Sequence, residues 1–135
     1  MLLLDSEALS AIAQRSPARQ HNAVRALISQ ARREGQDVAT SAAVLAEVIR
    51  GRQKDAAVHA ALSRERVRIY PVDNPVGIRA GQLIGASRSG SEMAVDAFIV
   101  ASADIAGGAV IATVDGSDIR RLASHASRVQ VADIG

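Results

Sequence analysis

At 135 residues the chain is long enough to bury one sizeable core, and its 48% apolar and 22% charged residues exclude a disordered protein. The absence of cysteine excludes disulfides, zinc–thiolate sites and thiol catalysis, and it fits a reducing cytoplasm. Residues 15–68 carry eleven Lys or Arg against five Asp or Glu, a net charge of +6, whereas the remainder carries −4. This division suits a protein that holds phosphates with one part and a metal with the other, but a solvated Arg-rich surface explains it equally well.

Hydrophobic periodicity predicts strands that alternate with helices along the whole chain. The predicted elements, in chain order, are a strand over 2–4, helices over 6–13 and 17–35, a strand over 37–40, helices over 41–51 and 54–63, a strand over 67–70, helices over 74–87 and 95–105, a strand over 109–113, a helix over 117–123 and a strand over 129–132. Such alternation predicts a parallel or mostly parallel sheet covered on both faces. With no repeat or linker, we expect one α/β domain over 1–135.

Two features at the helix and chain starts complete this prediction. Ser16 is expected to be the N-cap and Pro17 the first residue of the second helix. The apolar residues 2–4 are followed at once by Asp5 and preceded by no basic leader, so we expect neither a signal peptide nor a membrane span.

Four acidic residues occupy unusual places in this pattern. Asp5 directly follows the first strand and Asp115 follows the strand that ends at Thr113, so both lie at carboxyl ends of strands, where ligands of such sheets collect. Asp96 lies in the first turn of an otherwise apolar helix, and Glu47 interrupts another. Carboxylates that meet at one edge repel each other unless a cation compensates them. Oxygen ligands without cysteine or a suitably spaced histidine pair indicate Mg²⁺ or Mn²⁺.

Three of these acids also have an ordinary structural explanation. Asp5 or Asp96 alone could be a helix-start residue, which the helix dipole favours. Glu47 could form a surface pair with Arg50, three residues on. Taken singly these explanations are the better ones, and only the four acids together favour a metal site.

Four segments around these acids resemble the signature blocks of the PIN domain, in that family's order and spacing. They are Leu3-Leu4-Asp5-Ser6, Ala46-Glu47-Val48-Ile49-Arg50, Val95-Asp96-Ala97-Phe98-Ile99 and Ile111-Ala112-Thr113-Val114-Asp115-Gly116-Ser117-Asp118. Within the family the chain is most similar to the VapC-type toxins of bacterial toxin–antitoxin pairs. The resemblance implies a three-layer α/β/α fold with a central, mostly parallel, roughly five-stranded sheet.

The resemblance also implies a function and a site. Asp5, Glu47, Asp96 and Asp115 would form a catalytic, metal-holding pocket for Mg²⁺ or Mn²⁺, and Asp118 matches a further acidic ligand. The activity would be endoribonuclease cleavage of RNA in the cytoplasm. Implied partners are an RNA substrate, a VapB-type antitoxin that lays an apolar helix and an Arg into the acidic groove, and a second copy in a homodimer.

A few further positions of the PIN-domain pattern bear on how many metal ions would bind. Thr113 and Ser6 match small polar residues that orient the carboxylates. Two positions depart from the pattern: Met93, with Glu92 beside it, stands where relatives often carry another Asp, and Gly116-Ser117 stands where Pro or an acid is common.

Other classes of protein fit this pattern less well. A receiver domain needs a lysine after a late strand, but the single lysine, Lys54, lies in a predicted helix. A haloacid-dehalogenase-like phosphatase needs two Asp flanking one residue, and Asp5-Ser6-Glu7 lacks the second. The serious alternative is a PIN fold that binds RNA or protein without cutting.

Arginines of the basic segment are candidates for holding the RNA backbone. Those near predicted helix ends are favoured, and each could equally be part of a solvated face. They are Arg15, Arg19, Arg50 and Arg52.

Overall fold

Five strands form one sheet in the computed structural model, which describes residues 1–135. They are β1 (Leu2–Leu4), β2 (Val38–Ser41), β3 (Arg68–Tyr70), β4 (Ala109–Thr113) and β5 (Val129–Asp133). The sheet order is β3-β2-β1-β4-β5, and every neighbouring pair is parallel. In the central strand, Leu3 pairs with Ala39 of β2 and with Ile111 of β4. The predicted parallel sheet is therefore confirmed.

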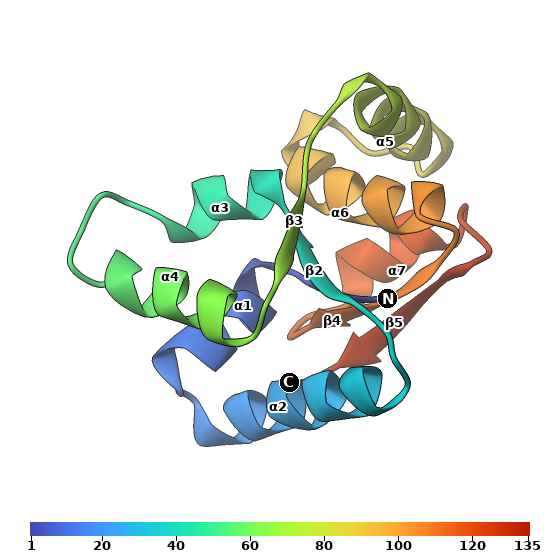
Figure 1. The fold of residues 1–135 in the computed structure, drawn as a ribbon. Coiled ribbons are helices and arrows are strands. Elements are labelled where there is room, and N and C mark those ends of the chain that lie inside the picture. The colour runs from blue at the N-terminus through green and yellow to red at the C-terminus, as the bar shows by residue number, and fades with distance from the viewer.

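Helices cover both faces of this sheet (Figure 1). They are α1 (Ser6–Gln14), α2 (Ala18–Arg33), α3 (Ala42–Val48), α4 (Asp55–Arg64), α5 (Asn74–Ala86), the short 3₁₀ helix η1 (Ser91–Met93), α6 (Ala94–Ile105) and α7 (Ser117–Ala123). The α1 and α2 helices pack on one face, with α4 against α1, and α5, α6 and α7 lie on the other. This is the expected three-layer α/β/α fold. None of the helices combines the length and the apolar composition that a bilayer span needs.

The handedness of the connections explains the two helical layers. The chain steps outward from β1 to β2 and β3, then returns past β1 to β4 and steps on to β5 in the opposite direction. Since crossovers between parallel strands are right-handed, reversing the direction moves the connecting helices to the other face. The direction changes between β1 and β4, and a crevice opens outside the carboxyl ends of strands at such a point. The fold therefore places Asp5 and Asp115 at the edge where ligands bind.

The core between the layers is aliphatic. The strand residues Leu3, Leu4 and Ile111 are fully buried, and so is Ile99 of α6. The two aromatic residues, Tyr70 and Phe98, are only partly buried and pack at the margin of the core. Small side chains allow helices and sheet to approach closely, and the buried α6 thereby holds its first turn, with Asp96, against the sheet edge.

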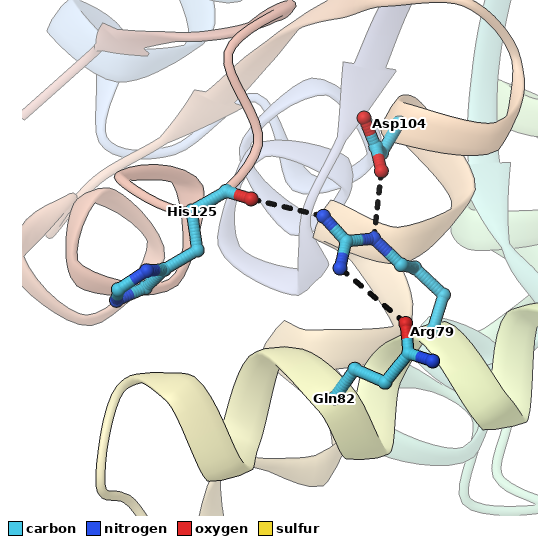
Figure 2. Close-up of polar contacts among 4 residues, drawn as sticks. All are labelled: Arg79, Gln82, Asp104 and His125. Carbon is cyan, nitrogen blue, oxygen red and sulfur yellow. Dashed lines mark hydrogen bonds and ion pairs between the residues drawn. The ribbon is translucent and has the colours of Figure 1, made fainter.

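Arg79 fastens the three helices of one face together (Figure 2). Its Nε donates to Asp104 of α6 at 2.7 Å, and its Nη2 donates to the His125 carbonyl, just after α7, at 2.9 Å. A weaker contact of 3.5 Å joins Nη1 to Gln82 on the same helix. Because the Arg79–Asp104 pair is partly buried, it fixes the end of α6 that lies opposite Asp96.

Two predicted helix boundaries are wrong. Ser16 does not cap α2: Pro17 is the N-cap, in extended conformation, and no side chain caps the helix. The chain leaves α1 through Arg15 in left-handed conformation, which leaves Ser16 in the turn rather than at the start of the helix. The helix predicted to reach Gly51 ends at Val48, because the amides of residues 50–52 donate to the Asp55 carboxylate instead of continuing the helix.

Candidate active site

Asp5 lies at the bottom of the crevice, directly after β1. It is the N-cap of α1, where its carboxylate accepts a 2.8 Å hydrogen bond from the Ala8 amide, and it is only 5% exposed. The ordinary helix-start explanation is therefore correct for Asp5, but it is incomplete. Burial raises the pKa of Asp5 to about 6, although the nearby Thr113 hydroxyl and the Ala8 amide act to lower it.

Asp96 brings a second carboxylate to the same place from the opposite helical layer. It lies in the first turn of α6 and is partly buried. Burial, and after it the negative charges of Asp5, Glu47 and Asp118, raise the pKa of Asp96 to about 6, with a smaller effect from Glu7. These five acids therefore share one electrostatic neighbourhood, although they come from four different helices or their caps.

Glu47 is exposed on α3 and is oriented by α1. The Ser6 hydroxyl donates to its Oε1 at 2.9 Å, which agrees with the orienting role expected for Ser6. The alternative pairing with Arg50 does not form, because the Arg50 guanidinium donates to the carbonyls of Ala46 and Ile49. Glu47 thus has no cationic partner within the protein.

Asp115 and Asp118 differ in their relation to Asp96. Asp118, in the first turn of α7, is one of the charges that act on Asp96. Asp115 is exposed beyond β4, its carboxylate accepts a 3.2 Å hydrogen bond from the Ser117 amide, and it is not among the charges that raise the pKa of Asp96. The Thr113 hydroxyl donates to the Asp115 carbonyl at 3.3 Å. The structure thus places Asp115 at the predicted edge, with its side chain engaged in the turn into α7.

The charge of Glu7 was not anticipated from the sequence. Glu7 lies in the first turn of α1 and raises the pKa of both Asp5 and Asp96. Acids are common in the first turn of a helix, because the helix dipole stabilises a negative charge there. The residue type and position of Glu7 therefore gave no special signal. Its place two residues after Asp5 was the only available clue.

No cation of the protein neutralises this group. The four ion pairs of the molecule join Arg64 to Glu65, Arg68 to Asp37, Arg79 to Asp104 and Arg120 to Asp133, and none includes a candidate acid. The side chains do not yet surround one point, since no three acids or histidines are placed to hold a single metal ion. The donor chemistry nevertheless fits a hard divalent cation, because the group offers only oxygen ligands and an excess of negative charge.

The fold and the site together define an α/β protein with an uncompensated acidic group at the switch point of a parallel sheet. The sequence matches the model of the PIN domain family over residues 2–124, and the chain belongs to this family.

Solved structures share this fold. A chain of the DNA-bound VapBC structure from Salmonella typhimurium is 18% identical, with a TM-score of 0.66 over 99% of this chain and 98% of that one. A chain of VapBC2 from Rickettsia felis, bound to a DNA fragment from its promoter, is 14% identical, with a TM-score of 0.66 over 98% and 97%. No curated protein sequence matched this chain.

Proposed function

We propose that this chain is a Mg²⁺- or Mn²⁺-dependent endoribonuclease, the VapC-type toxin of a toxin–antitoxin pair. One observation carries the proposal: Asp96 shares its surroundings with Asp5, Glu47 and Asp118, and no cation of the protein offsets their charge. Such a group is unfavourable for folding unless a ligand requires it. Membership of the PIN family supports the reading of that ligand as a divalent metal.

We assign the acids different roles in metal binding according to how buried each one is. Asp5, fixed by the Ala8 amide at the end of β1, and Asp96, fixed by the buried α6, would be the rigid ligands. Asp118 and Glu47 are exposed and would complete the shell from α7 and α3, with Ser6 orienting Glu47. Asp115 is the remaining ligand of the proposal, reached by a turn of its side chain away from Ser117. A bound divalent ion lowers the pKa of a water and stabilises charge on phosphate oxygens.

The chain's own residues would act on the RNA by position. The burial of Asp5 and the partial burial of Asp96 lower the local dielectric, so that charges placed there interact more strongly than in water. Glu47, which is exposed at the rim, would hold a water at the open side of the group.

The proposed partners follow from the family and from the similar structures. Those structures are VapBC complexes bound to DNA. By analogy we include a VapB-type antitoxin, a homodimer and a cytoplasmic location, with residues 1–135 acting as one domain. A groove of about 460 Å³ beside the acids, lined among others by Ser6, Glu7 and Glu47, offers an antitoxin segment a negatively charged surface.

A PIN fold that binds without cutting is the second candidate. Met93 is buried in the core, where relatives often carry an acid, and the carboxylate of Glu92 accepts from the Gly90 amide instead of joining the group. The site therefore lacks one acid, and this specific absence favours weak catalysis.

The experiment is cleavage of total cellular RNA by purified, partner-free protein, with and without Mg²⁺ or Mn²⁺. We expect discrete metal-dependent fragments that disappear in the Asp5→Asn/Asp96→Asn double variant. Asp104→Asn is the matched control, since it removes an acid from the same helix but outside the group, and it should cut normally. No cleavage by folded, metal-loaded wild-type protein would reject the nuclease and leave the binding module.

A further inference from the structure

Besides the groove beside the acids, the protein has a basic cavity where the end of α1 packs against α2 and α4. It has a volume of about 250 Å³. Its lining residues are Ile12, Arg15, His21, Arg25, Arg64 and Glu65. The floor is the buried side chain of Ile12, and three guanidinium groups face one carboxylate. The cavity therefore has an excess of positive charge.

The cationic groups of this cavity have donors to spare. Neither Arg15 nor Arg25 makes a side-chain hydrogen bond or ion pair within the protein. Arg64 donates only from Nε to Glu65, at 3.2 Å, and exposed pairs of this kind are weak. Since each guanidinium carries five N–H donors, most of the donors of the three arginines are unused.

His21 adds a polar edge to the cavity. Its Nδ1 lies 3.1 Å from the Ala11 carbonyl. Because a carbonyl only accepts, Nδ1 must carry the proton and donate, and this leaves Nε2 as the ring atom available to a ligand. The ring is thus oriented by α1 before anything binds.

Arg15 has an unusual backbone conformation. Arg15 ends α1 with φ +58°, a left-handed position where glycine is the usual residue and other L-residues are strained. This position turns the chain between α1 and α2, and the Arg15 side chain lines the cavity.

The cavity and the acidic group lie at the two ends of one helix. Asp5 precedes α1 and Arg15 follows it, and the ten residue steps between them rise about 15 Å. The groove that begins at Ser6 and Glu47 runs beside α1 as far as Ser16 and Pro17, which directly follow Arg15 in the chain. The far end of the groove and the basic cavity therefore meet at the same turn between α1 and α2, although they share no lining residue.

From this arrangement we infer that the cavity binds a backbone phosphate of single-stranded RNA, a few nucleotides from the bond that is cut. Arg15, Arg25 and Arg64 would donate to the phosphate oxygens, whereas Nε2 of His21, which carries no proton in this tautomer, would accept from a ribose hydroxyl. Arginine forks match phosphate geometry, and the contact would be independent of base sequence. This inference rests on the proposed ribonuclease function for the identity of the strand.

The test is binding of a labelled, mixed-sequence single-stranded RNA in EDTA, followed across a range of salt concentrations. Losing one phosphate contact on a single strand reduces the slope of log affinity against log salt by about 0.7. We expect this loss in Arg25→Ala and in Arg15→Gly. The second variant removes the guanidinium while placing a residue that adopts the left-handed conformation without strain, so it should fold as well as the wild type.

Arg33→Ala is the matched control. Arg33 is an exposed arginine of the same helix as Arg25, in its last turn, and it has no side-chain partner. Its variant should keep the wild-type slope. Equal slopes in all four proteins would overturn the inference, and so would an equal reduction in all three variants, which would show only a diffuse effect of net charge. Loss of binding to polyglutamate with unchanged RNA binding would assign the cavity to an acidic protein and also overturn it.

Cleavage assays of the same proteins separate this inference from the proposed function. If the wild-type protein cuts RNA and the variants bind RNA normally, the phosphate-binding role of the cavity is rejected and the proposed nuclease function stands. If the protein does not cut RNA but its RNA affinity depends on Arg15 and Arg25, the phosphate-binding role of the cavity stands and the nuclease function is rejected.

Discussion

At the scale of single residues, Asp5 and Asp96 link stability to pH. The pKa of each is raised to about 6 in the folded protein, mainly by burial. A carboxyl whose folded pKa is raised favours folding most when protonated, so its contribution is present below the unfolded value near 4 and is lost as pH rises through about 6. The acidic group is thus a local cost at neutral pH.

We therefore predict that metal-free protein melts at a lower temperature at pH 8 than at pH 5. Asp96→Asn should melt a few degrees higher than wild type at pH 8 in EDTA, and this difference should shrink at pH 5. Thermal unfolding followed by circular dichroism at both pH values measures this. A variant that is less stable than wild type at pH 8 would show that the charge of Asp96 is already compensated.

Thr40 fixes the end of β1 next to Asp5. It is fully buried, and its hydroxyl donates to the Leu4 carbonyl at 2.8 Å. Thr40→Val keeps the shape but removes the donor, and we predict a loss of about 1–3 kcal/mol in the free energy of unfolding. Urea titration measures it, and an unchanged midpoint would mean that another donor satisfies Leu4.

At the scale of elements, the helices of one face depend on Arg79. Arg79→Ala leaves Asp104 and the His125 carbonyl without their shared partner (Figure 2), and we predict a loss of about 2 kcal/mol in the free energy of unfolding. Gln82→Ala removes only the 3.5 Å contact and should cost far less. Equal midpoints for the two variants in urea would show that helix packing alone holds α5, α6 and α7 together.

The segment between α3 and α4 depends in the same way on Asp55. Backbone hydrogen bonds from Arg50, and then from Arg52 and Gly51, lower the pKa of Asp55 against the opposing effect of burial. A lowered pKa contributes stability above the unfolded value, and that stability is lost on acidification through the folded pKa. We predict that in Asp55→Asn the amide protons of residues 50–52 exchange with solvent faster than in the wild type at pH 7. Hydrogen exchange measures this, and unchanged protection of these amides would contradict the role of Asp55.

At the scale of the whole molecule, the sequence determined the elements more completely than the site. Alternating apolar runs and caps predicted all five strands and the α/β class, because burial on both faces leaves a clear pattern. Asp5 and Asp96 were found because an acid directly after a buried strand, or inside an apolar helix, is conspicuous.

The rest of the site depends on contacts between distant segments. Glu7 joins the acidic group from an ordinary helical position, and the basic cavity combines arginines from α1, α2 and α4. Arg15 was a candidate from its place near a helix end, but Arg25 lies inside α2 and gave no signal. No local sequence pattern specifies which side chains of different helices come together, because these contacts form only when the helices pack.

The central claim is that the acidic group around Asp96 exists to hold a divalent ion, and calorimetric titration with Mn²⁺ at pH 7.5 tests it most directly. The account predicts saturable binding by the wild type that weakens at least about 10-fold in Asp96→Asn and is unchanged in Asp104→Asn. Absence of saturable binding, or equal binding by the wild type and Asp96→Asn, would contradict it.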